Sequence, residues 1–276
     1  MTTWAPGDPL DGSPPDVRAL AATPDGSVLF VASADGIVAY SASDFSSPLA
    51  TTTDTDPAPA GTALACGQTS AGPMTLCVAK GGSTVDFYSL TGATFDTFDS
   101  VTVSGVILAM AAEVFEGDVL TLVVLTTGTT NVWMYDITAS SAAPQVVLVL
   151  RGGVGIATGA GFAASSPASV LLGDFAPQPD PLPVPQPYPL QIAYNVGDQI
   201  VVVQVARVNA THDEFQSAYI LTLGASAGDI TSLSRAPADP AGGYDAIAIG
   251  QPVGTPDLLA TSDAAGGAAL HVEPIL

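Results

Sequence analysis

Residues 17–44 read VRALAATPDGSVLFVASADGIVAYSASD, and this stretch decides the fold. It contains three apolar runs separated by two turn signals. The first signal is TPDG at residues 23–26, where proline fixes its own φ and glycine tolerates a positive φ. The second is ADG at residues 34–36, an Asp-Gly hairpin signal between β-rich flanks. The pattern predicts a tight antiparallel meander, to which residues 49–53 add a fourth strand.

Weaker copies of this pattern recur along the chain. Units begin near residues 18, 62 and 106, about 44 residues apart, which is the length of a four-stranded propeller blade. The turns between their apolar runs are rich in glycine, serine and threonine, as expected between short strands. No segment shows a sustained helical pattern. We therefore expect an all-β fold.

The later units are less regular. A fourth unit, a fifth unit and a sixth unit are predicted from strand-like runs in the second half of the chain. Their predicted strands are 156–162 and 169–175; then 190–196, 199–208, 217–223 and 229–235; then 244–250, 258–262 and 269–275. The resulting prediction is a single β-propeller over residues 1–276, with about six four-stranded blades and seven possible.

The sixth unit shows only three strands, so we expect terminal strands to close the ring. Closing the ring buries an otherwise loose sheet edge. Thr3 and Trp4 are the predicted donor, because Trp4 supplies a large apolar anchor near the start of the chain.

Residues 176–189 form a proline-rich arm or loop. Proline cannot donate a ladder hydrogen bond, which excludes a central strand and predicts an extended polyproline-II segment. One interpretation is a stiff loop over a blade edge. The other is an arm that docks on a neighbouring subunit, since such segments lose little entropy on binding. The candidate contact residues are Pro177, Pro179, Pro181, Pro183, Pro185, Pro187, Tyr188 and Pro189.

The stretch at residues 19–40, ALAATPDGSVLFVASADGIVAY, resembles the repeat of the YVTN and lactonase-type propellers, whose blades carry a similar S-P-D-G turn before an apolar strand. The resemblance implies a propeller blade. It implies no activity, because no residue of this chain matches the metal-binding carboxylates of a lactonase funnel. The WD-repeat signature is not evident.

The charge balance excludes several partners. The chain has 5 Lys+Arg against 26 Asp+Glu, a net charge of −21, and Lys80 is its one lysine. Nucleic-acid binding needs a basic stripe, which these residues cannot build. No apolar run is long enough for membrane insertion, and residues 1–8 lack the features of a signal peptide. Localisation stays open between a virion, an extracellular surface and the cytoplasm. The acidic balance fits either an ordinary soluble surface or adaptation to high salt.

The chemistry-bearing residues are few. His212, Asp213 and Glu214 are adjacent in a predicted polar loop, where they could contact a partner or a metal, although consecutive residues rarely converge on one ion. Cys66 and Cys77 flank a predicted hairpin, and we expect two buried free thiols rather than a disulfide. No cofactor is expected. Acidic pairs such as Asp54/Asp56 and Asp96/Asp99 leave Ca²⁺ possible.

These features predict a non-enzymatic propeller that serves as a structural or protein-interaction module. Its composition suggests other protein subunits as partners, in an assembly such as a virion tail, fibre or capsid decoration. One alternative is a glycan-binding adhesin, which would need exposed aromatic side chains. The other is a lactonase-like hydrolase, which would need a carboxylate cluster at the funnel. The aromatic candidates for glycan binding are Trp133, Tyr135, Tyr188 and Tyr194.

Overall fold

The described residues form five four-stranded antiparallel sheets, each made of four consecutive strands. The computed structural model describes residues 17–33, 36–52, 63–70, 72–80, 82–115, 118–127, 132–139, 146–154, 169–175, 190–196, 199–209, 212–222, 230–236, 245–250, 258–262 and 270–274. All the regular secondary structure in these residues is β-strand, which confirms the all-β prediction. The described part contains no helix that could cross a bilayer.

The first three sheets follow the repeat read from the sequence. Sheet A comprises β1 (Val17–Ala22), β2 (Val28–Ser33), β3 (Gly36–Ser41) and β4 (Asp44–Thr52). Sheet B comprises β5 (Leu64–Gly67), β6 (Met74–Lys80), β7 (Thr84–Thr91) and β8 (Thr94–Thr102). Sheet C comprises β9 (Ile107–Phe115), β10 (Val119–Thr126), β11 (Val132–Ala139) and β12 (Val146–Val154).

The last two sheets are formed by the second half of the chain. Sheet D comprises β13 (Val170–Gly173), β14 (Leu190–Val196), β15 (Gln199–Asn209) and β16 (His212–Thr222). Sheet E comprises β17 (Ser232–Ala236), β18 (Ala246–Gly250), β19 (Leu258–Ser262) and β20 (Leu270–Pro274).

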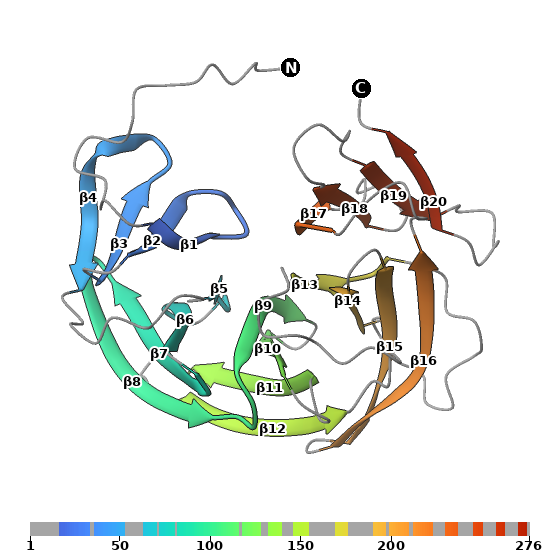
Figure 1. Cartoon of the computed structure of the whole chain (residues 1–276). Coiled ribbons are helices and arrows are strands. Elements are labelled where there is room, and N and C mark those ends of the chain that lie inside the picture. The colour runs from blue at the N-terminus through green and yellow to red at the C-terminus, as the bar shows by residue number, and fades with distance from the viewer. Residues whose placement is uncertain are drawn as a thin grey trace.

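The five sheets follow one another around an arc, as the blades of a propeller do (Figure 1). The first strand of each sheet lies toward the middle and the fourth strand lies outside. Neighbouring inner strands contact one another in the order β1, β5, β9, β13 and β17. Sheets A and E stand at the two ends of the arc (Figure 1).

Four apolar clusters hold neighbouring sheets together, one at each junction. Strand β10 contributes side chains to two of these junctions. Leu122 and Val124 pack toward sheet B, whereas Val123 and Leu125 pack toward sheet D. Successive side chains of a strand point to opposite faces, so a strand buried on both faces reads as a continuous apolar run.

The opening turn has the geometry that the sequence predicts. The Gly26 amide donates to the Thr23 carbonyl at 2.8 Å, and Gly26 has a φ of +69°. The Asp25 carboxylate accepts bonds from the Ser27 amide at 3.0 Å and the Ser27 hydroxyl at 2.8 Å. A bond from the Thr23 hydroxyl, followed by these two from Ser27, lowers the pKa of Asp25 to about 2.

The predicted division of the second half of the chain is wrong. Strand β13, predicted for a fourth unit, pairs with β14, predicted for a fifth, so both belong to sheet D. The proline-rich residues 176–189 interrupt one sheet in sequence and do not separate two sheets. The other strand predicted for the fourth unit, at residues 156–162, lies outside the described residues.

The last sheet also differs from the prediction. Residues 229–235 were predicted to end a fifth unit, but β17 is the inner strand of sheet E and pairs with β18. Sheet E therefore has four strands from the C-terminal part of the chain, and it needs no donated strand to reach that number. Thr3 and Trp4 lie outside the described residues, so ring closure by terminal strands stays a prediction, as does the single-domain organisation.

Candidate functional site

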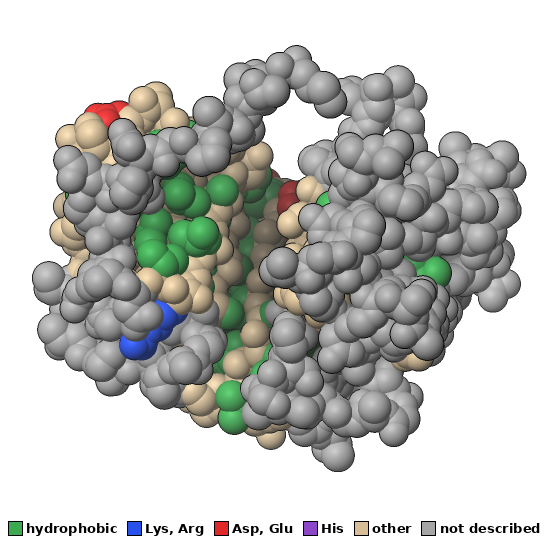
Figure 2. Space-filling model, turned by 45° about the horizontal axis from the view of Figure 1, so that its top comes forward, with side chains coloured by type: hydrophobic (Ala, Val, Ile, Leu, Met, Phe, Trp, Pro, Cys, Tyr) green, Lys and Arg blue, Asp and Glu red, His purple; other side chains and the backbone are tan. Residues whose placement is uncertain are grey.

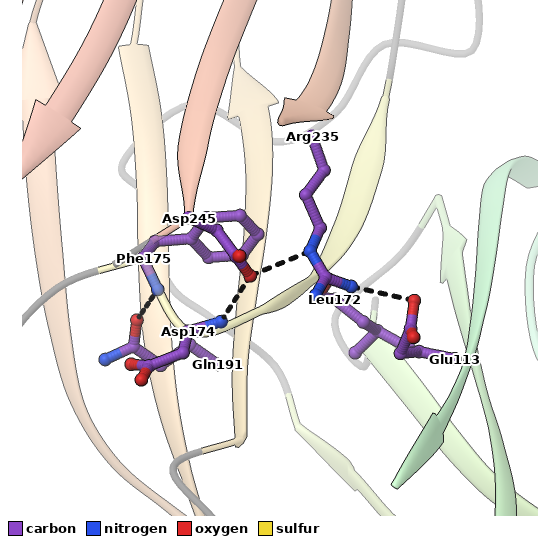
Figure 3. A network of polar contacts seen from close by, with 7 residues as sticks. All are labelled: Glu113, Leu172, Asp174, Phe175, Gln191, Arg235 and Asp245. Carbon is purple, nitrogen blue, oxygen red and sulfur yellow. Dashed lines mark hydrogen bonds and ion pairs between the residues drawn. The ribbon is translucent and has the colours of Figure 1, made fainter. Parts of the chain in front are cut away.

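The inner strands of sheets C, D and E bring a polar network together around Arg235 (Figure 3). Arg235 lies in β17 and reaches across the inner strand of sheet D to sheet C. Its Nη1 donates to the Glu113 carboxylate of β9 at 2.8 Å and to the Leu172 carbonyl of β13 at 3.2 Å. A single guanidinium thus contacts three consecutive sheets.

Asp245 supplies the second anion of the network. Its Oδ2 lies 2.7 Å from Nε of Arg235, although the N–H direction makes this an ion pair rather than an aligned hydrogen bond. The same carboxylate accepts a bond from the Asp174 amide at 3.0 Å. The Asp245 amide in turn donates to the Asp174 carbonyl at 2.7 Å, which ties the end of β13 to the start of β18.

A glycine makes room for this carboxylate. A Cβ atom at Gly173 would lie 2.5 Å from Oδ2 of Asp245 and 2.8 Å from Cζ of Phe175. Beside it, the Phe175 amide donates to Oε1 of Gln191 at 2.7 Å, and Gln191 donates to Oε1 of Gln204 at 2.9 Å. Both glutamines are buried, so these bonds satisfy polar groups that would otherwise destabilise the core.

Burial dominates the electrostatics of the network. Desolvation, followed by the Asp245 charge, raises the pKa of Asp174 to about 6, and the Arg235 charge opposes this shift. The pKa of Glu113 is also raised by desolvation, and the Arg235 charge opposes this rise without cancelling it. Oδ1 of Asp174 is buried and has no hydrogen-bond partner. The charged form of Asp174 is therefore poorly stabilised in the folded chain.

Chemically, this arrangement is a set of ion pairs that joins neighbouring sheets. Arg235 forms ion pairs with the carboxylates of Glu113 and Asp245 and donates to the Leu172 carbonyl, and its charge also acts on Asp174. Within the described residues, no three His, Cys, Asp or Glu side chains are arranged to hold a metal ion. Asp96 and Asp99 lie in β8, while Asp54 and Asp56 fall outside the described part. Calcium binding is therefore still an untested prediction.

The predicted polar loop at His212, Asp213 and Glu214 is wrong. These residues begin strand β16, and their backbones pair with Asn209, Arg207 and Ala206 of β15. Only residues 210–211 separate the two strands. A run of polar residues is typical of a loop, but the outermost strand of a blade also tolerates polar residues along its free edge. The eight proline-arm residues from Pro177 to Pro189 lie outside the described residues.

The aromatic candidates for glycan binding are mostly core residues. Tyr135 is 4% exposed and packs in the junction between sheets B and C. Tyr194 is fully buried between sheets C and D. Trp133 packs against the cluster that holds Tyr135, and its indole N–H donates to the Thr126 hydroxyl at 3.1 Å. Tyr188 lies outside the described residues.

The two cysteines are buried free thiols, as predicted. The register of sheet B explains why they are not bonded to each other. Cys66 pairs with Leu76 and shares its face toward sheet A, whereas Cys77 pairs with Ala65 and faces sheet C. Burial raises the pKa of Cys66 to about 12 and raises that of Cys77 as well.

Sequence reasoning missed the Arg235 network and one serine motif. Nothing in the spacing of Glu113, Asp174 and Asp245 indicates a cluster, because only the sheet order brings them together. Residues 224–228 read GASAG, which matches the G-x-S-x-G spacing of serine hydrolases. That motif needs a strand-to-helix turn, but here it stands between strands β16 and β17, and its residues are outside the described part.

Comparisons with known proteins support the propeller fold. No family model and no curated protein matches the chain. Among solved structures, Sqt1 of Saccharomyces cerevisiae matches with a TM-score of 0.57 at 16% identity, over 95% of this chain and 62% of that one. The WD40 domain of SCAP from fission yeast matches with a TM-score of 0.52 at 12% identity, over 95% of this chain and 64% of that one.

A third similar structure is the complex of the fission yeast SREBP–SCAP binding domains. It matches with a TM-score of 0.53 at 12% identity, over 95% of this chain and 74% of that chain. The chain thus spans less than two thirds of the length of the first two structures. At these identities the likeness supports a β-propeller fold and nothing more specific.

Proposed function

We propose that this chain is a non-enzymatic β-propeller that acts as a protein-interaction module in a larger assembly. The observation that carries the proposal is the use of the ionisable groups at the inner strands. Arg235 forms ion pairs with Glu113 and Asp245, at N–O distances of 2.8 and 2.7 Å, and the first pair joins sheet E to sheet C. Groups held in such pairs stabilise the ring of blades and are poorly placed to act on a substrate.

The similar structures add weight to a protein partner. One of them is a complex of SREBP and SCAP binding domains, in which a WD40-like propeller is part of a protein–protein assembly. Propellers serve many unrelated functions, so this support is by analogy. The buried positions of Tyr135 and Tyr194 count against a glycan-binding surface built on those rings.

For the type of assembly we propose a virion component, such as a tail, fibre or capsid-decoration protein. The support is compositional: 11% charged residues, a net charge of −21 and a proline-rich stretch at residues 176–189, a kind of sequence that loses little entropy on binding. The proposed membership of the YVTN and lactonase-type group rests on residues 19–40, where the expected turn and strands are present.

One observation favours a second candidate, a propeller hydrolase. Asp174 has a pKa raised to about 6 and a buried oxygen without a hydrogen-bond partner, which are features found at catalytic carboxylates. Against it, the neighbouring carboxylates of Glu113 and Asp245 are already paired with Arg235. An assay of lactone and ester hydrolysis with added Ca²⁺, comparing the natural chain with Asp174→Asn, separates the two candidates.

The interaction proposal is tested by light scattering coupled to size-exclusion chromatography on the chain purified from its native source. We expect a complex well above the mass of one chain, with a second protein in fixed stoichiometry. A monomer without a partner, together with hydrolysis that Asp174→Asn abolishes, would overturn the proposal in favour of the hydrolase.

A further inference from the structure

Sheet E stands at one end of the arc, and one apolar junction joins its described residues to the rest of the fold (Figure 1). Leu233, Ile247 and Ile249 of sheet E belong to the cluster shared with sheet D and to none of the other three. Sheets B, C and D each contribute to two clusters. Since units with fewer buried contacts open at lower free energy, sheet E should open more readily than a middle sheet.

A pair of backbone segments closes the inner end of the same junction. Asp174 follows β13 of sheet D, and Asp245 precedes β18 of sheet E. The Asp174 amide donates to Oδ2 of Asp245 at 3.0 Å, and the Asp245 amide donates to the Asp174 carbonyl at 2.7 Å. These bonds bring two acidic residues from different sheets to one place. The two residues separate again if sheet E moves away from sheet D.

The carboxylate of Asp174 lacks the partners that the carboxylate of Asp245 has. Its Oδ1 is buried and accepts no hydrogen bond. In Figure 3 the Asp174 side chain points away from the Arg235 guanidinium, whereas the Asp245 carboxylate points toward it. A buried charged oxygen without a donor is unfavourable, and a second carboxylate nearby adds repulsion. A proton on the Asp174 carboxyl group removes the charge that causes both effects.

The charged groups around Asp174 come from three elements among the described residues. Strands β9, β10, β14 and β17 contact β13. Of these, β9 contributes Glu113 and β17 contributes Arg235, while Asp245 precedes β18. Strand β10 has no titratable side chain, and the one on β14 is Tyr194, at the other end of the β13–β14 ladder. The only positive charge in this set is therefore already paired with the other two carboxylates.

We propose that Asp174 is a proton-sensitive contact that controls how readily sheet E opens away from sheet D. With the Asp174 carboxyl group protonated, sheet E stays docked; with the group ionised, sheet E opens more often. The docked arrangement, through burial and then through the Asp245 charge, raises the pKa of Asp174 from 3.8 to about 6. Opening admits water and separates the two carboxylates, so the pKa returns toward 3.8.

The sign of the effect follows from this difference. The docked form binds the proton more tightly than the open form, so protonation stabilises docking. This stabilisation is complete below about pH 4 and is lost as the pH rises through about 6. Glu113, whose pKa is also raised in the docked form, acts with the same sign.

Water reaches this network from the middle of the molecule. Figure 2 shows the middle hollowed, with acidic side-chain surface on its wall. The side chains of Glu113 and Arg235 are 29% and 27% exposed, whereas that of Asp245 is 6% exposed. The network thus touches solvent at one border and is buried at the other, so protons exchange with it without unfolding of the chain.

Hydrogen–deuterium exchange with mass spectrometry at pH 5 and pH 7.5, corrected for the intrinsic pH dependence of amide exchange, tests the proposal. We expect strand β18 (Ala246–Gly250) to open about tenfold more often at pH 7.5. Strand β2 (Val28–Ser33) of sheet A, the other end of the arc, is the internal control and should change much less. Urea below the unfolding transition should leave exchange in β18 nearly unchanged, as expected of a local opening.

Two variants assign the effect to one carboxyl group. Asp174→Asn keeps this position neutral, so β18 should exchange slowly at both pH values. Asp96→Asn removes an exposed carboxylate from β8 of sheet B and should keep the tenfold change. Equal opening of β18 at the two pH values in the natural chain would overturn the proposal. So would a full pH response in Asp174→Asn, or equal responses in β2 and β18.

Discussion

The guanidinium of Arg235 lies 2.8 Å from the carboxylate of Glu113, although 122 residues separate them in sequence. The two side chains belong to the inner strands of sheets E and C, and sheet D stands between those sheets in the arc. The contact therefore spans a whole blade. Sheet E is thus held in the arc by this ion pair with sheet C as well as by its apolar junction with sheet D.

Replacing Arg235 with methionine should lower the free energy of unfolding by about 3 kcal/mol, because Glu113 and the 6% exposed Asp245 lose their counter-charge. Urea denaturation measures the change. The control is Lys80→Met, which removes a single 3.1 Å ion pair, with Asp86 inside sheet B, and should cost less because one carboxylate rather than two loses its counter-charge. Equal losses in the free energy of unfolding would show that the contact across sheet D stabilises the fold no more than an ion pair within one sheet.

Asp174 should make the chain more stable in mild acid. Its pKa is raised from 3.8 to about 6, so the folded state binds a proton more tightly than the unfolded chain does. The free energy of unfolding should then rise as the pH falls from about 7 toward 4. Glu113, whose pKa is also raised, contributes with the same sign.

Asp174→Asn should remove the Asp174 part of this pH dependence. At pH 7–8 it should raise the free energy of unfolding by about 1 kcal/mol, less than the full linkage value because the side chain is partly solvated. Denaturation curves at several pH values test this. A variant as pH-dependent as the natural chain, and no more stable at neutral pH, would contradict the assigned shift.

The opening blade and its period could be predicted from the sequence because both depend on local chemistry. Gly26 adopts the positive φ that the TPDG turn requires, and alternating apolar residues define the strands on either side. The division of the second half failed for a non-local reason. Strands β13 and β14 are neighbours in sheet D, but residues 174–189 separate them in sequence.

The candidate site could not be predicted at all. Glu113, Asp174, Arg235 and Asp245 meet because sheets C, D and E are consecutive blades, and no local spacing encodes that meeting. The thiols show the opposite case. Their free state follows from strand alternation, since the register of β5 and β6 points Cys66 and Cys77 to opposite faces.

Both thiols should be unreactive in the folded chain. Burial raises their pKa values, to about 12 for Cys66, so almost no thiolate exists at pH 8. Iodoacetamide followed by mass spectrometry should show no labelling over hours in buffer and two labels in denaturant. Rapid labelling of either thiol in the folded chain would mean that its junction opens readily.

Gly173→Ala should destabilise the junction between sheets D and E by about 2 kcal/mol through overpacking. The added methyl group would lie 2.5 Å from Oδ2 of Asp245 and would push that carboxylate away from Arg235. Thermal denaturation gives the loss. If displacement of the carboxylate contributes, Gly173→Ala should cost less when Asp245 is already alanine, and the remaining cost comes from Phe175, whose Cζ would lie 2.8 Å from the methyl group. An equal cost in both backgrounds would assign the whole effect to Phe175.

The central claim is that this propeller functions by binding another protein, and cross-linking mass spectrometry on the chain in its native source tests it most directly. Because Lys80 is the one lysine while Asp+Glu number 26, the cross-linker should couple carboxylates. We predict reproducible cross-links to one protein partner, present in fixed ratio to the chain. Cross-links confined to the chain itself, in material that migrates as a monomer, would contradict the claim.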